Sequence, residues 1–225
     1  MRIDPTLIRG QLRPRTRDPG GSWRASASVT PSEQSTIAAV FNGGFRLSDR
    51  SPSGYFSEGR TVAPLRDGDA SLVLHNDGTA DVGAWNHEVQ MSPTVASVRQ
   101  NLVPLVGAGQ VNPSCATGGS REWGNTVGQA AYIHRSGFGV TATGAEVYAG
   151  GPALSVCTLG RILQDAGVVR GMELDINPTR VSSAYFHAKP NGTAAGFRLF
   201  PDERVDPLHY LQPSSRDWFA WFIRP

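Results

Sequence analysis

The sequence is poor in lysine, in cysteine and in long hydrophobic runs. One of its 21 basic residues is a lysine, Lys189, so the other 20 are arginines, and 19 acidic residues leave a net charge of +2. A charge so close to zero argues against a protein that binds nucleic-acid polymers. The arginine bias has two explanations, a GC-rich genome or the fit of the guanidinium to phosphate. Composition alone does not choose between them.

No apolar run is long enough to cross a membrane, so we expect no membrane span. The N-terminus lacks the apolar segment of a signal peptide, which leaves the location open between the cytoplasm and export after removal of an earlier segment. Cys115 and Cys157 do not form a C-x-x-C pair, which argues against structural zinc. We expect two free thiols, with a disulfide in an exported protein as the alternative. The histidines are scattered, so we predict no metal site and no cofactor, while a divalent metal stays open.

The length and turn content predict a single α+β domain. A chain of 225 residues with 26 glycines and 16 prolines favours many turns and short strands over a helix bundle. We expect a mixed, mostly antiparallel sheet with a few packed helices. Residues 1–32 are rich in Arg, Pro, Gly and Ser and are interpreted as an extended arm that packs on the domain formed by residues 33–225.

Local patterns predict the individual elements. The best helix candidate is 155–166, because its apolar residues fall on one face and Gly167 follows as a stop signal. Asp77-Gly78 and Thr143-Gly144 lie at the centres of two hairpins. We expect strands at 37–41, 71–75, 80–85, 95–102, 131–140, 146–149, 168–176 and 217–224, and loops at 46–68 and 107–129.

Two carboxylates and an amide alternate at the end of the strand predicted for 168–176. If the strand continues to its end, Glu173, Asp175 and Asn177 share one face, each about 6.5 to 7 Å from the next. Paired carboxylates at such distances are typical of glycoside hydrolysis. The alternative is an amphipathic strand with a solvated face. Glu173 and Asp175 are therefore the candidate catalytic pair, and Asn177 a candidate ligand of the substrate.

Further candidates follow two other strands. Asn42-Gly43-Gly44 ends the strand predicted for 37–41, where glycines allow a ligand to approach the backbone closely, although an ordinary turn has the same composition. Arg99 and Arg135 lie inside otherwise apolar strands and need anionic partners. A carboxylate would make each arginine structural, whereas a substrate phosphate would make it functional.

Taken in order, these motifs resemble the phosphodiester glycosidase family. The resemblance rests on residues 41–45, 135–144 and 171–175, joined by the predicted helix. It extends to 18–21, 58–60, 99–102 (which includes Asn101) and 214–217, a pattern similar to an actinobacterial branch. Most relatives continue after the aspartate with a glycine-rich turn, where this chain has Ile176-Asn177-Pro178. Glu173 stands where many relatives have asparagine.

The resemblance implies a hydrolase that cleaves the glycosidic C–O bond of a sugar phosphodiester, either a small molecule or a glycan. Asp175 and Glu173 would be catalytic. The substrate would be bound by Asn42, Gly43, Gly44, Arg99, Asn101, Arg135 and Asn177. The alternatives are a phosphodiesterase or nucleotide-sugar-processing enzyme of the same fold, and a non-catalytic module that binds glycans or phosphopolymers. Members of the family are often exported.

Overall fold

Short strands assemble into three sheets in the computed structural model, which describes residues 1–48, 53–213 and 215–225. Within these ranges, every pairing between the named strands is antiparallel. The first sheet has the order β1 (Arg2–Ile3), β12 (Glu146–Leu154), β11 (Ile133–Thr141), β13 (Val168–Glu173), β9 (Pro104–Gly107) and β10 (Gln110–Val111). The second has the order β15 (Ala194–Arg198), β14 (Ser183–Ala188), β3 (Ile37–Asn42), β16 (Trp218–Ile223) and β2 (Ile8–Arg13). The third has the order β5 (Arg60–Ala63), β4 (Tyr55–Ser57), β8 (Val95–Gln100), β6 (Ala70–His75) and β7 (Ala80–Ala84).

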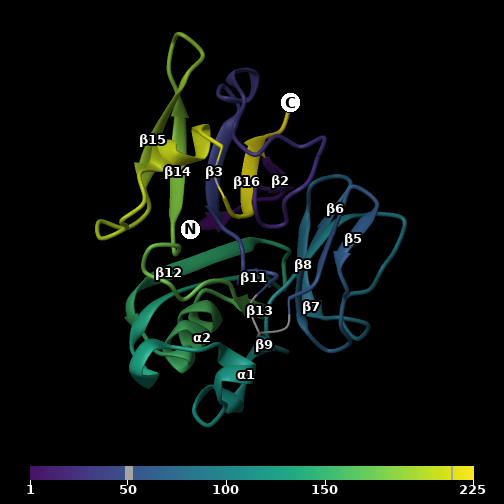
Figure 1. Ribbon diagram of the computed structural model, residues 1–225, viewed down its shortest axis with the longest axis vertical. Coiled ribbons are helices and arrows are strands. Elements are labelled where there is room, and N and C mark those ends of the chain that lie inside the picture. The colour runs from purple at the N-terminus through teal and green to yellow at the C-terminus, as the bar shows by residue number, and fades with distance from the viewer. Residues whose placement is uncertain (49–52, 214) are drawn as a thin grey trace.

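Helices are few, and the predicted α+β class is confirmed, with the strands divided among three sheets. The helix α2 (Val156–Asp165) packs against the first sheet, as Figure 1 shows. Its N-cap Ser155 accepts a hydrogen bond from the Thr158 amide at 3.1 Å, and Gly167 has a φ of +86° after its end. The other helical segments are α1 (Ser120–Trp123) and the 3₁₀ turns η1 (Pro31–Glu33), η2 (Pro113–Cys115), η3 (Val127–Gln129) and η4 (Pro207–Leu211). Within the described ranges, no helix has the length and hydrophobicity needed to cross a bilayer.

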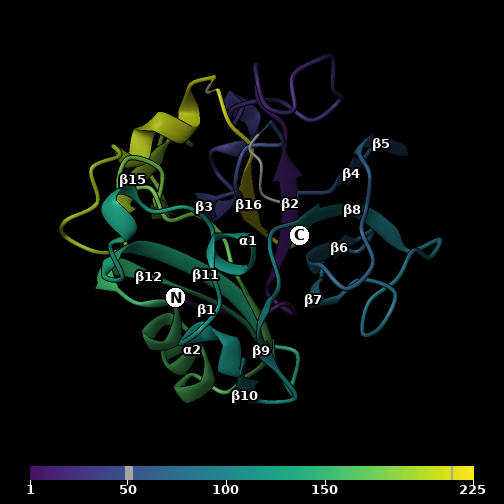
Figure 2. The same ribbon diagram turned by 60° about the horizontal axis from the view of Figure 1, so that its bottom comes forward.

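A cluster of aromatic side chains joins the sheets. Phe41 of β3 stacks on Tyr148 of β12 and on Trp221 of β16, each with a distance of 4.5 Å between ring centroids. The surrounding core also takes apolar residues from the third sheet. The sheets surround this core from different sides (Figures 1 and 2). Because Phe41 precedes Asn42, this packing fixes the end of β3, where the candidate site begins.

Several local predictions hold and others are wrong. The two predicted hairpins form as β6–β7 and β11–β12. The loop predicted for 46–68 is wrong, because β4 and β5 form within it, and its residues 49–52 lie outside the described ranges. The loop predicted for 107–129 contains β10, α1 and two 3₁₀ turns. Of residues 1–32, interpreted as an arm, β2 pairs with β16 along its whole length.

The expectation of two free thiols is wrong. Cys115 and Cys157 form a disulfide that connects η2 to the first turn of α2, with 5.0 Å between their Cα atoms. The two cysteines are 42 positions apart in the sequence. Their proximity depends on how η2 packs against α2, which no local pattern in the sequence reveals.

Candidate active site

The ends of β3, β11 and β13 are tied together by side-chain hydrogen bonds. The Asn42 amide group donates to the Ser136 hydroxyl at 3.0 Å and to its neighbouring Gly43 carbonyl at 2.8 Å. The Asn42 Oδ1 atom accepts from the Tyr148 hydroxyl at 3.0 Å and from the Ser182 amide at 3.2 Å. Asn42 therefore connects the second sheet to the first by hydrogen bonds. Both its side-chain nitrogen and its side-chain oxygen have partners within the protein.

Asp175 lies beyond the end of β13, which finishes at Glu173 rather than at the predicted residue 176. Its main chain pairs with Ser136, whose amide donates to the Asp175 carbonyl at 2.9 Å. The Asp175 Oδ1 atom accepts from the amides of Ile176 at 2.7 Å and Asn177 at 2.9 Å. A backbone turn, rather than strand alternation, therefore orients this carboxylate, which is only 4% exposed.

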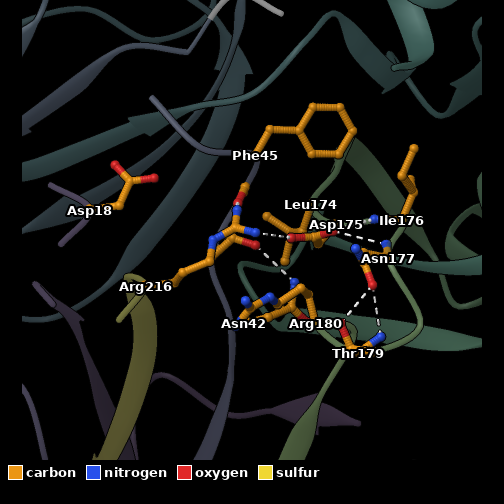
Figure 3. A network of polar contacts seen from close by, with 12 residues as sticks. Asp18, Asn42, Phe45, Leu174, Asp175, Ile176, Asn177, Thr179, Arg180 and Arg216 are labelled. Carbon is orange, nitrogen blue, oxygen red and sulfur yellow. Dashed lines mark hydrogen bonds and ion pairs between the residues drawn. The ribbon is translucent and has the colours of Figure 1, made fainter. Parts of the chain in front are cut away.

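An arginine faces the other carboxylate oxygen. Arg216 Nη1 lies 3.3 Å from Asp175 Oδ2, and Arg216 Nη2 donates to the Gly44 carbonyl at 2.7 Å (Figure 3). Burial raises the pKa of Asp175, and the positive charge of Arg216 opposes that rise. The carboxylate thus has one oxygen fixed by backbone amides and the other next to a cation.

Asp175 and Arg216 line a small cavity with a volume of about 40 Å³. The cavity is not enclosed but opens to solvent, so a ligand bound at its wall can extend beyond this volume. Its wall carries two carboxylates and three guanidinium groups, together with small polar and aromatic residues. The lining residues are Arg15, Asn42, Gly43, Gly44, Asp175, Thr179, Arg180, Ser182, Val205, His209, Tyr210, Arg216, Asp217 and Trp218.

Among the described residues, larger cavities lie elsewhere, and one of about 370 Å³ is lined by Arg13, Glu33 and Glu58. A second, of about 340 Å³, is lined by residues of β2 and of the third sheet. A third, of about 420 Å³, is lined by Cys115 of the disulfide and by residues at the start of α2. The carboxylates that line these larger cavities, Glu33 and Glu58, are partly exposed rather than buried. We place the candidate active site in the smaller cavity because it combines buried carboxylates with several cations.

Arg99 and Arg135 each have a carboxylate partner inside the protein. Arg99 is fully buried, and its Nε donates to Asp217 Oδ2 at 2.6 Å. Arg135 Nη1 donates to Glu173 Oε2 at 2.9 Å. Of the two alternatives for these arginines, the carboxylate partner is therefore the one observed. Neither guanidinium lines the Asp175 cavity, although Asp217 does.

Glu173 and Asn101 are buried and do not line the cavity. Glu173 is completely buried, and burial raises its pKa to about 7 against the opposing effect of Arg135. The Asn101 amide group donates to the carbonyls of Glu173 at 2.9 Å and Leu174 at 2.7 Å, and its Oδ1 accepts from the Phe45 amide at 2.9 Å. Asn101 therefore holds the segment that leads to Asp175.

The paired glycines approach the protein's own side chains. A Cβ atom on Gly43 would lie 2.7 Å from Asp217 Oδ2 and 2.8 Å from the Asp217 carbonyl. One on Gly44 would lie 2.9 Å from Asn101 Oδ1. Asn177, in contrast, is exposed, and its Oδ1 accepts from the Thr179 amide at 2.9 Å. The cavity thus includes Asn42, Gly43, Gly44 and Asp175 from the predicted set, whereas Asn177 lies outside its lining.

Sequence reasoning missed Arg15, Arg180 and, as functional groups, Arg216 and Asp217. Arg216 and Asp217 belong to the motif at 214–217, which the sequence offers only as part of a family pattern; Ser214 lies outside the described residues. Arg15 lies in the segment interpreted as an arm. No signal in the sequence indicates that it reaches the cavity. Within the described ranges, no group of three or more His, Cys, Asp or Glu side chains is placed to bind a metal ion.

The fold is similar to that of a catalytic domain of known structure. No protein-family model matches the chain, and no curated protein matches its sequence. Among solved structures it is similar to the catalytic domain of zebrafish N-acetylglucosamine-1-phosphodiester alpha-N-acetylglucosaminidase, auto-inhibited by its pro-peptide. That match has a TM-score of 0.58 and 14% identity, and covers 98% of this chain and 74% of that one. A hypothetical protein from Synechocystis matches with a TM-score of 0.47 and 12% identity, over 99% of this chain and 58% of that one. At such identities the first likeness concerns the fold, and it supports the family resemblance at that level.

Proposed function

We propose that the protein is a hydrolase that cleaves the glycosidic C–O bond of a sugar phosphodiester and releases the sugar and a phosphomonoester. One observation carries the proposal: the buried Asp175 carboxylate faces a cavity whose wall holds three arginines. A phosphate monoester leaves with little need for protonation. The site must therefore stabilise an oxocarbenium-like transition state, deliver water and bind an anion.

Asp175 is proposed as the base or nucleophile. The two backbone amides hold Oδ1, so Oδ2 is the atom directed toward the arginine and the cavity. Burial raises the pKa of Asp175, and the positive charge of Arg216 opposes that rise and so favours the ionised form that either role requires. A phosphate group bound by Arg216 would compete with Asp175 for that arginine and would therefore lie beside Asp175 Oδ2.

Arg216 and Arg180 are proposed to bind the phosphate. The sequence assigned this role to Arg99 and Arg135, but those two arginines neutralise Asp217 and Glu173. Both arginines line the cavity of Asp175, and repulsion from Arg216 contributes to lowering the pKa of Arg180, after the larger effect of burial.

The second carboxylate and the sugar contacts are also reassigned. Asp217 lines the cavity, and its Oδ1 atom has no hydrogen-bond partner among the described residues, whereas Glu173 is buried and does not line the cavity. We therefore propose Asp217 as the carboxylate partner of Asp175. Asn42 shapes the wall with Gly43 and Gly44, and Asn177 is proposed to contact the sugar from the solvent side.

Replacement of Asp175 by asparagine tests the proposal. The variant Asp175→Asn keeps an oxygen for the two backbone amides but removes the charge. We expect hydrolysis in a screen of sugar phosphodiesters, run with and without a chelator, to fall by about a thousandfold. Glu146→Gln is the matched control, because Glu146 is also buried but lies outside the cavity. Wild-type rates in Asp175→Asn, with an unchanged thermal unfolding curve, would refute the role of Asp175.

The same screen distinguishes a glycosidase from a non-catalytic binding module and, once the cleaved bond is identified, from a phosphodiesterase. A non-catalytic module would bind sugar phosphodiesters without releasing product. A phosphodiesterase would release product, but from cleavage of the P–O bond.

A further inference from the structure

Arg15 is a buried cation that forms no ion pair with a carboxylate of the described residues. Its side chain lies just beyond β2, is 3% exposed, and lines the same cavity as Asp175. Its Nε and Nη1 atoms have no hydrogen-bond partner among the described residues. The guanidinium carbon lies 5.6 Å from the ring centroid of Tyr210 and 5.2 Å from that of Trp218. Aromatic faces stabilise a cation but accept no strong hydrogen bonds.

The other fully buried arginines of this fold show what Arg15 lacks. Arg13, two residues earlier, forms an ion pair with Glu33, and Arg99 and Arg135 form the pairs described above. A buried cation without a partner is costly. Burial lowers the pKa of Arg15 to about 10, so it stays charged at neutral pH. Arg15 therefore has the features of a side chain whose missing anionic partner is supplied by a bound ligand.

The charges around the cavity exceed what one phosphodiester can balance. Among the residues that line the cavity, Arg15, Arg180 and Arg216 are opposed by Asp175, because Asp217 is paired with Arg99; Asp18, outside the lining, also interacts with Arg216. Two positive charges are left, and a phosphodiester supplies one negative charge. Arg180 lines the same cavity as Arg216 and Arg15 and interacts electrostatically with both, so the excess charge lies on the wall that holds the proposed phosphate ligands.

We propose that Arg15 binds a second phosphoryl group adjoining the scissile one, so that the substrate class is a sugar linked through a pyrophosphate. This inference rests on the proposed function and specifies its substrate. In the reaction, water adds to the anomeric carbon and the bond from that carbon to the phosphoryl oxygen breaks. The bonding electrons leave with the pyrophosphate ester, and the proton of water passes to Asp175 and then to solvent. No oxidant or further reactant is required.

Anion binding by the full chain tests this inference without turnover. The probes are inorganic pyrophosphate and inorganic orthophosphate at one fixed ionic strength, measured by isothermal titration calorimetry. We expect wild-type protein to bind pyrophosphate about tenfold or more tightly than orthophosphate. Arg15→Met, which keeps the apolar stem, should lose about tenfold in affinity for pyrophosphate and less than about threefold for orthophosphate, and Arg15→Lys should recover part of the loss. Arg24→Met is the control, because the Arg24 side chain is 86% exposed.

Stability provides an independent readout. Because Arg15→Met removes an unpaired buried charge, we expect its melting temperature to be equal to or above that of the wild type. A marked fall would show that Arg15 is a structural arginine and would overturn the inference. Equal loss of affinity for both anions would also overturn it, because Arg15 would then bind the first phosphate. Failure of the proposed function is a different result: the wild type would hydrolyse no sugar phosphodiester and no sugar linked through a pyrophosphate.

Discussion

Removal of the Cys115–Cys157 disulfide should lower the free energy of unfolding by about 4 kcal/mol. The bond closes a loop between residues 42 positions apart. In the chain-entropy description, releasing a loop of that length returns about 13 cal/mol/K to the unfolded chain, or about 4 kcal/mol at 25 °C. A domain of ordinary stability has about 5 to 15 kcal/mol in total, so the change is large. It acts on the unfolded chain more than on any contact of the folded protein.

Urea unfolding of the oxidised wild type and of Cys115→Ser/Cys157→Ser measures this difference. Reduced wild-type protein is the control for the serine hydroxyls, because it keeps both sulfur atoms. We expect the variant and the reduced protein to unfold at similar, lower urea concentrations, while thiol titration of the denatured, oxidised wild type detects no free thiol. A loss below about 1 kcal/mol in both samples would contradict the entropic reasoning, and free thiols in the oxidised sample would show that the bond does not form.

Two further predictions concern Glu146 and Gly43. Burial raises the pKa of Glu146 from its ordinary value of 4.5 to about 7, so its carboxyl binds a proton more strongly in the folded protein and stability falls as pH rises between these values. The expected loss is about 3 kcal/mol in urea unfolding, and Glu146→Gln should flatten that pH dependence; an unchanged slope would contradict the assignment. Gly43→Ala should cost about 1 to 3 kcal/mol and reduce activity, because its Cβ would meet the main chain of Asp217. Gly107→Ala, where a Cβ meets nothing within 4 Å, is the neutral control, and equal stability of the two variants would refute the steric explanation.

Local patterns were sufficient to predict the elements that depend on local chemistry. The helix α2 follows from its apolar periodicity and from Gly167, and the hairpins follow from their glycine turns. The strands β4 and β5 were missed because β4 has three residues and β5 is largely exposed, which leaves no hydrophobic alternation to detect. The pairing of β2 with β16 is also not visible in local patterns, because it joins segments from the two ends of the chain.

The sequence predicts part of the candidate site, the position of Asp175, but strand alternation is not the physical reason for it. Asp175 does lie on a cavity wall, but β13 ends before it, and the amides of Ile176 and Asn177 set its direction. Alternation along a strand could not show this turn.

The partners of the arginines required the folded structure. Arg99 meets Asp217 across 118 positions of sequence, so neither residue type nor spacing could distinguish a structural arginine from a phosphate ligand. Arg15 has no local signature, because its burial depends on Tyr210 and Trp218 from the far end of the chain.

Hydrolysis of a sugar phosphodiester in ¹⁸O-labelled water tests the proposed reaction most directly. We expect mass spectrometry to find the label in the released sugar, because water assisted by Asp175 attacks the anomeric carbon. The label in the phosphomonoester, with none in the sugar, would show attack on phosphorus and would contradict cleavage of the glycosidic C–O bond.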